Sequence, residues 1–150
     1  MSRSPAAIEV MSKRLHSNLE EAANRAEATA LLIRCGYKVY RPEADTNGED
    51  LVLRTQDGEL IAVQLKSRVY VSQPRYGGKD IWLLLPSGRF QHGMKRNWYL
   101  VPHDHLFAHI ESRHGQSAPT WAGEWSYPGI PAHVAEVLAS YQVKAATVTD

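Results

Sequence analysis

The fold is decided by the stretch GEDLVLRTQDGELIAVQLKSR, residues 48–68. Two apolar runs of strand length flank a polar turn that contains Asp-Gly, which is the pattern of a β-hairpin. A two-residue loop would place Leu51 opposite Gln64 and mix polar with apolar side chains on both faces. A three-residue loop, with Gly58 in the left-handed conformation, places Leu51 opposite Val63 and gives one apolar face. Because a one-residue slip turns every side chain over, the pattern favours the three-residue loop.

Three polar side chains meet at one end of this predicted hairpin. Asp50 lies opposite Gln64, and Lys66 follows on the same face because successive strand side chains alternate. Directly opposed positions lie about 5 Å apart at Cβ, so a carboxylate and an amide oxygen can share a divalent cation there. Mg²⁺ prefers oxygen ligands, and the carbonyl of Leu65 would add another. The prediction is a metal site with Lys66 beside it; the alternative is a solvated sheet face with incidental polar residues.

A carboxylate on the preceding helix is a further candidate. The helix is predicted to begin at a capping-box pattern at Ser17 and to end at Gly36. Glu27 lies on it with Ala23 and Leu31 one turn away on either side, so we expect its face to look toward the sheet. The alternative is a glutamate on the solvent face of the helix.

The remaining elements follow from apolar runs and turn residues. The order of elements is α-β-β-β-β-β-α, which predicts one α/β (α+β) domain over residues 1–150. Strands are expected at 37–40, 51–54, 60–66, 81–86 and 98–102, a polar loop at 89–97, an irregular Trp-rich segment at 120–131, and helices after Ser4-Pro5 and at about 131–141.

Composition excludes several classes of protein. The chain has 150 residues, of which 43% are hydrophobic and 22% charged, as is usual for a globular domain. Its single cysteine, Cys35, excludes an internal disulfide and is expected to be a buried apolar residue. No signal-peptide pattern or apolar run of membrane-spanning length is present, so we expect a cytoplasmic protein.

The net charge of +1 hides an uneven distribution. Between Lys66 and Arg96 there are seven basic residues and one acidic residue, Asp80, with four aromatic residues interleaved. Basic and aromatic side chains together are typical of a polyanion-binding surface. The alternative is a basic surface that only keeps the protein soluble. The predicted DNA-binding side chains are Arg68, Arg75, Lys79, Lys95 and Arg96.

The order of helical Glu27, Gly36-Tyr37 opening a strand, Asp50 and then Gln64-Leu65-Lys66 resembles the PD-(D/E)xK nuclease superfamily. It is most similar to the branch with QxK, which includes group I intron homing endonucleases and small bacterial endonuclease-like proteins. The resemblance covers about residues 20–105.

The resemblance implies a restriction-endonuclease-like fold, with a central mixed sheet flanked by helices. It also implies Mg²⁺- or Mn²⁺-dependent hydrolysis of DNA, double-stranded or branched. Asp50 and Gln64 would then bind metal, Lys66 would be catalytic, and Glu27 would hold metal or water. Because Gln64 stands where the family usually has a carboxylate, the site has one negative charge fewer. Cutting both strands needs two sites, so we expect a homodimer or homotetramer.

Two other functions compete with the nuclease. The first is a catalytically inactive nucleic-acid-binding or interaction protein on the same fold. The second is a zinc-dependent hydrolase centred on His103 and His105, with His109 nearby. Histidines exposed in a loop after the 98–102 strand are the simpler interpretation of these three residues. Trp121 and Trp125 are expected in the core or at an interface, with stacking on bases as the alternative.

Overall fold

The structure is a computed structural model that describes residues 17–44, 48–91, 93–115 and 118–144. The first helix predicted after Ser4-Pro5 lies outside the described residues. None of the helices in these ranges is long and apolar enough to cross a membrane.

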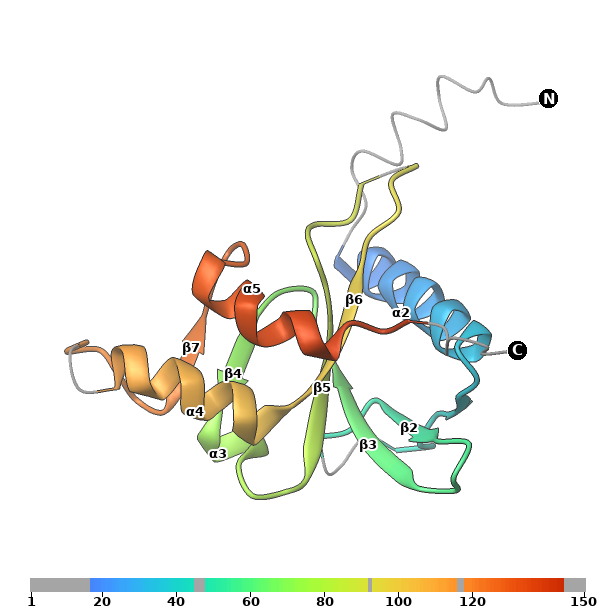
Figure 1. Cartoon of the computed structure of the whole chain (residues 1–150), viewed down its shortest axis with the longest axis horizontal. Helices are drawn as coiled ribbons and strands as arrows, with labels where there is room; N and C mark the ends of the chain where they lie inside the picture. The colour runs from blue at the N-terminus through green and yellow to red at the C-terminus, as the bar shows by residue number, and fades with distance from the viewer. Residues whose placement is uncertain (1–16, 45–47, 92, 116–117, 145–150) are drawn as a thin grey trace.

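A five-stranded mixed sheet forms the centre of the molecule (Figure 1). Its strands lie in the order β1-β2-β3-β5-β6. The β3–β5 pair is parallel and the other three pairs are antiparallel. The strands are β1 (Lys38–Tyr40), β2 (Leu51–Arg54), β3 (Leu60–Leu65), β5 (Ile81–Pro86) and β6 (Trp98–Pro102). The last two confirm the bounds predicted from the apolar runs 81–86 and 98–102.

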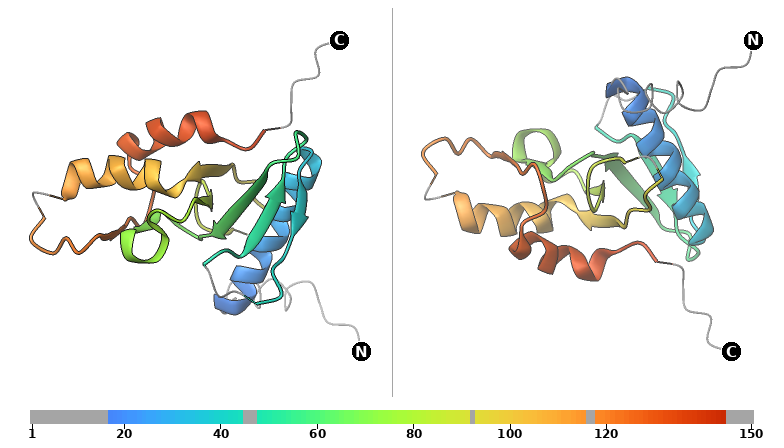
Figure 2. Two further views of the ribbon diagram at one scale, coloured as in Figure 1. Left: turned by 90° about the horizontal axis from the view of Figure 1, so that it is seen from below. Right: turned by 90° about the horizontal axis from the view of Figure 1, so that it is seen from above.

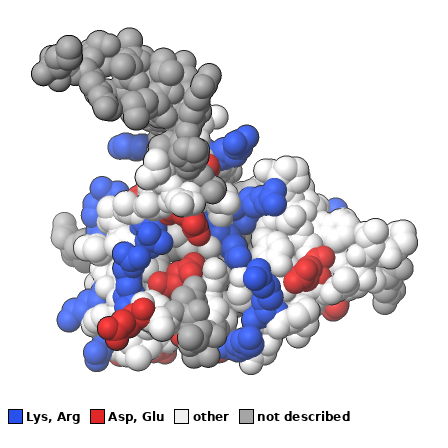
Figure 3. All heavy atoms as spheres, turned by 180° about the vertical axis from the view of Figure 1, so that it is seen from behind, with Lys and Arg blue, Asp and Glu red and all other residues white. Residues whose placement is uncertain are grey.

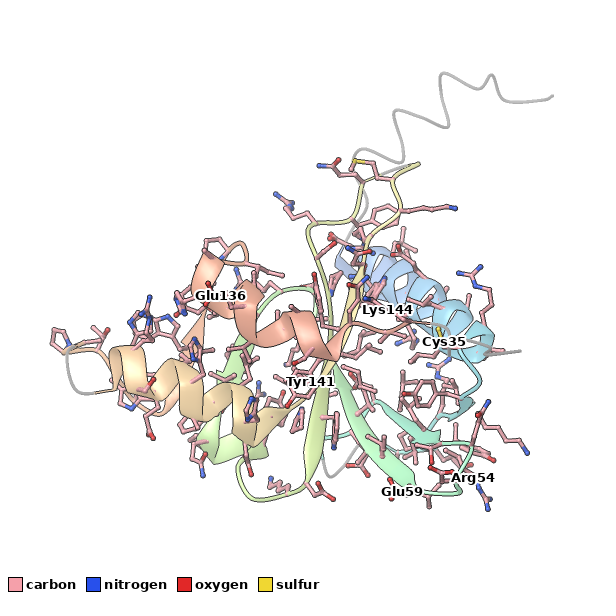
Figure 4. The ribbon with its side chains drawn as sticks, in the orientation of Figure 1. Cys35, Arg54, Glu59, Glu136, Tyr141 and Lys144 are labelled. Carbon is pink, nitrogen blue, oxygen red and sulfur yellow. The ribbon has the colours of Figure 1, made fainter. Side chains whose placement is uncertain are left out.

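The β2–β3 hairpin has the predicted register. Leu51 pairs with Val63. The N–H of Thr55 donates to the carbonyl of Glu59 at 2.9 Å, and Gly58 has φ +89°, so the connection is the three-residue loop with a left-handed glycine. The loop lies at the tip of the hairpin, near the labelled Arg54 and Glu59 (Figure 4). One face of both strands is therefore apolar, as the sequence pattern requires.

Helices cover both faces of the sheet (Figure 2). On one face, α2 (Ser17–Arg34) packs Ala28 and Leu32 against buried residues of the sheet that include Leu51, Val63 and Leu84. On the other face, α4 (His103–His114) and α5 (Ala132–Leu138), which continues into the 3₁₀ turn Ala139–Tyr141, pack over a second core. The helices predicted from Ser17 to Gly36 and at about 131–141 are confirmed, and Gly36 follows α2 with φ +97°.

A small second sheet was not predicted. It pairs β4 (Tyr70–Ser72) with β7 (Glu124–Ser126), and the short helix α3 (Gln73–Tyr76) follows β4 directly. The segment predicted to be irregular and Trp-rich thus contributes a strand. The prediction of a histidine-bearing loop after β6 was wrong, because residues 103–114 form α4 with Leu106, Phe107 and Ile110 buried on one side.

Candidate functional site

Asp50 directly precedes β2 and lies beside the C-terminal end of β3. Its N–H donates to the carbonyl of Val63 at 2.7 Å, and its Oδ2 accepts the N–H of Leu65 at 2.9 Å. The register would bring the carbonyl of Glu49 to that N–H if β2 continued. The carboxylate therefore takes the place of a strand carbonyl and satisfies a donor that the end of β2 leaves unpaired.

Gln64 and Lys66 occupy the C-terminal end of β3. They alternate with Val63 and Leu65, which pack in the core on the α2 face, so their side chains leave β3 on the opposite face. Gln64 is the Cα partner of Leu83 on β5, whereas the pairing of β3 with β2 ends at Val63, so the predicted pairing of Asp50 with Gln64 is not formed. Gln64 and Lys66 are half-buried.

Two tyrosine rings lie next to the Lys66 ammonium. Its Nζ is 4.8 Å from the ring centroid of Tyr70 and 5.1 Å from that of Tyr76. Tyr70 belongs to strand β4 and Tyr76 to the short helix α3 that follows it. Neither element was predicted from the sequence. The only sequence signal for this contact was the basic and aromatic composition of the 66–96 segment.

A pocket of about 330 Å³ opens at this end of β3. It is lined by Glu20, Glu21, Asn24, Gln64, Leu65, Lys66 and Ser67. A second hollow of about 480 Å³ shares Glu20 and Ser67 with it and also contains Arg68 and Arg89. The two therefore adjoin. Asp50 does not line either hollow, although its carboxylate accepts the N–H of Leu65, which lines the first.

Glu20 is a candidate that sequence reasoning missed. It lines the pocket together with Gln64 and Lys66. Glu20, Asn24 and Glu27 stand at positions i, i+4 and i+7 of α2, so they form one polar stripe along the helix. That spacing was readable in the sequence and would have placed Glu20 on the same face as Glu27.

Glu27 forms an ion pair with Arg96, which comes from the segment between β5 and β6. The Arg96 side chain is only 4% exposed, and it also donates to Oδ1 of Asn24 at 2.6 Å. Its guanidinium carbon lies 5.4 Å and 5.0 Å from the rings of Phe90 and Trp98. The burial argues against the predicted DNA contact by Arg96, because its charge is used inside the protein. The predicted metal-binding role of Glu27 stays a prediction.

The other four predicted DNA-binding residues are exposed: Arg68, Arg75, Lys79 and Lys95. On the face drawn in Figure 3, Lys and Arg side chains lie on both sides of a central group of Asp and Glu side chains. A hydrogen bond to the Tyr70 side chain raises the pKa of Arg75 above its usual value.

The positions of the histidines on and near α4 contradict the predicted zinc site at His103 and His105. His103 is fully buried: its Nε2 accepts the N–H of Ser72 at 3.0 Å, and its Nδ1 lies 2.9 Å from Oδ1 of Asp104. Burial lowers the pKa of His103, so the neutral ring with hydrogen on Nδ1 fits both contacts. His105 is exposed, and His109 lies beside His133 instead. Among the described residues, no three His, Cys, Asp or Glu side chains are grouped to hold a metal ion.

The donors at the end of β3 are of the kind that hard cations prefer. They comprise the Asp50 carboxylate, the Gln64 amide oxygen, the backbone carbonyl of Leu65 and, across the pocket, the Glu20 carboxylate. Oxygen donors in small number, with space for water, suit Mg²⁺ or Mn²⁺ better than zinc. The residue types therefore fit such an ion.

Comparisons with known proteins bear on the fold. No family profile matches the chain, and no curated protein matches it in sequence. Among solved structures, that of the bacterial homing endonuclease I-Ssp6803I is similar, with a TM-score of 0.51 and 18% sequence identity over 86% of this chain and 88% of that chain. This similarity, together with the five-stranded mixed sheet between helices, shows that the chain has an endonuclease-like α/β fold.

Proposed function

We propose that the protein is a metal-dependent DNA endonuclease of the PD-(D/E)xK superfamily, in its QxK branch. The observation that carries the proposal lies at the C-terminal end of β3, where the Asp50 carboxylate accepts the N–H of Leu65 and where Gln64 and Lys66 leave the strand on the face opposite Val63 and Leu65. The likeness in fold to a homing endonuclease supports the same function.

Asp50, Gln64 and the carbonyl of Leu65 would hold Mg²⁺ or Mn²⁺. When bound, such an ion activates water and neutralises charge on a phosphoryl oxygen. Lys66 supplies a positive charge at the same end of β3, where it stabilises the charge that develops on the phosphate in the transition state. Asp50 also keeps the end of β3 in place by accepting the N–H of Leu65.

We assign the helical carboxylate of the site to Glu20 in preference to Glu27. Glu20 lines the pocket with Gln64 and Lys66, whereas Glu27 is engaged by Arg96. A carboxylate at Glu20 would offset the negative charge that Gln64 lacks.

The substrate we propose is double-stranded or branched DNA. Arg68 and Arg89 line the hollow that adjoins the pocket, so a phosphate next to the cleaved one would meet two guanidinium groups. Each chain has one such site, and cutting both strands requires two. We therefore propose a homodimer or homotetramer as the active form.

The second candidate function is an inactive DNA-binding protein on the same fold. Two observations favour it: the Asp50 carboxylate already accepts a backbone N–H, and Glu27 is bound to Arg96. Both carboxylates therefore have a structural use that would persist without catalysis.

A plasmid-nicking assay with Mg²⁺ or Mn²⁺ separates the two functions. The endonuclease hypothesis expects nicking by the wild type and a loss of about 100-fold or more in Lys66→Ala. Asp50→Asn keeps an oxygen for the Leu65 N–H but removes the charge, and it is expected to lose activity while remaining folded. Lys38→Ala, an exposed lysine on the edge strand β1, is the matched control. Binding of DNA without cleavage in either metal would favour the second function.

A further inference from the structure

The Lys66 ammonium lies in a corner made by two aromatic rings. The rings of Tyr70 and Tyr76 are 6.4 Å apart at their centroids and inclined by 85°, and Nζ is about equally far from both. Ring faces attract a cation through their quadrupole, and the attraction grows when the pair is withdrawn from water. Here Lys66 and Tyr70 are half-buried and Tyr76 is 4% exposed.

Both rings are themselves held by neighbours. The Tyr70 hydroxyl donates to Oε1 of Glu124 on β7 at 3.2 Å, and the Ser72 hydroxyl donates to the same oxygen at 2.8 Å. Tyr76 packs edge-on against the buried ring of His103, with centroids 5.5 Å apart. The corner is therefore built from β4, α3, β7 and α4, and its geometry is fixed by contacts outside the pocket.

An aromatic partner has a chemical advantage over a carboxylate at this position. A carboxylate beside Lys66 would compete with a phosphoryl oxygen for the ammonium N–H groups. A ring face restrains the long, flexible side chain and leaves its charge and its donors for the substrate. Restraint of such a side chain also avoids the loss of rotamer entropy when the substrate arrives.

We propose that Tyr70 and Tyr76 are positioning residues for Lys66, and that the β4–β7 sheet serves to hold Tyr70 in place through Glu124. The role in cleavage rests on the proposed endonuclease function. The placement of the Lys66 ammonium against the rings is independent of that function, and it is measured in a separate experiment.

The placement is tested by the NMR signals of the Lys66 ε-methylene group, identified with Lys66→Arg, in the free protein without metal. Protons above a ring face are shifted upfield. The expected result is an upfield signal in the wild type and in Tyr70→Phe, with a shift toward the ordinary position in Tyr70→Leu. An ordinary signal in the wild type, or one that Tyr70→Leu leaves unchanged, overturns the proposal. This arm does not depend on whether the protein cleaves DNA.

The role in cleavage is tested by single-turnover rates and DNA affinities of the same variants. Tyr70→Leu is expected to slow cleavage by about five- to thirtyfold, the range for one cation–π contact, with DNA affinity unchanged. Tyr70→Phe keeps the ring and is expected to retain the wild-type rate. Tyr40→Leu, at an exposed tyrosine on β1, is the control. Equal slowing by Leu and Phe, or equal rates in all variants, overturns the positioning role. Absence of cleavage in the wild type refutes the proposed function. The NMR result would still show whether the Lys66 ammonium lies against the tyrosine rings.

Discussion

Replacing Glu27 by alanine tests what the ion pair on α2 contributes. In the folded protein Arg96 is 4% exposed at its side chain, and Glu27 is 29% exposed. After the replacement, the guanidinium would keep two oxygen acceptors, Oδ1 of Asn24 at 2.6 Å and the carbonyl of Gly88 at 3.1 Å. It would lose Glu27, its one carboxylate partner within the described part of the chain, and its positive charge would remain in place.

The expected cost follows from that environment. Removing one member of a fully buried ion pair destabilises a protein by about 3–5 kcal/mol, and a charge-assisted hydrogen bond alone contributes about 1.5–3 kcal/mol. Because Glu27 is partly exposed, water can enter and replace some of the lost interaction. We therefore expect the free energy of unfolding to fall by about 2–3 kcal/mol, which corresponds to a decrease in Tm of about 5–10 °C for a chain of this length.

Urea and thermal unfolding followed by circular dichroism would measure this cost. Glu21→Ala, at an exposed glutamate on the same helix, is the control and is expected to change stability by about 0.5 kcal/mol or less. In an Arg96→Ala background, Glu27→Ala is expected to cost little more, because the pair is already broken. A Glu27→Ala protein as stable as Glu21→Ala would refute the structural role. A folded Glu27→Ala protein that needs far more Mn²⁺ for cleavage would instead support its role as a metal ligand.

Three further predictions concern single residues. Glu20→Gln is expected to raise the Mn²⁺ concentration needed for half-maximal nicking by about tenfold without lowering Tm. Gly36→Ala is expected to lower the free energy of unfolding, measured in urea, by about 1–2 kcal/mol because φ is +97°, while Gly88→Ala, where no atom lies within 4 Å of the added Cβ, costs less. Burial holds the pKa of His103 below its usual 6.5. The stability contributed by its neutral ring is therefore fully present above about pH 6.5 and is lost as the pH falls. In His103→Gln, the slope of the unfolding free energy against pH below 6.5 is expected to be smaller.

The central sheet could be predicted from the sequence because its signals are local. The runs 81–86 and 98–102 are continuous and apolar, and the structure confirms them as β5 and β6. Alternation alone fixed the β2–β3 register, since only one loop length gives an apolar face. That register also places Asp50 beside the end of β3, where its carboxylate accepts the N–H of Leu65, and this is the part of the site that the sequence could supply.

The remainder depends on contacts between distant segments. Strand β4 has three residues and pairs with β7 more than fifty residues later, so neither strand has a local pattern long enough to detect. The ring partners of Lys66 were missed for the same reason. Helix α4 was obscured by its polar start at His103, although Leu106 and Ile110 recur at helical spacing. Glu20 was missed because its position relative to β3 depends on how α2 packs.

The hydrogen bond from Leu65 to Asp50 has a consequence for how relatives of this protein are judged. A descendant of this protein could lose catalysis and still need an acidic side chain at position 50. Without that side chain, the N–H of Leu65 would have no hydrogen-bond acceptor in its place. Retention of that aspartate would then report selection for folding alone. Loss or retention of the lysine two residues past Gln64 is the more informative sign of whether such a descendant still cuts DNA.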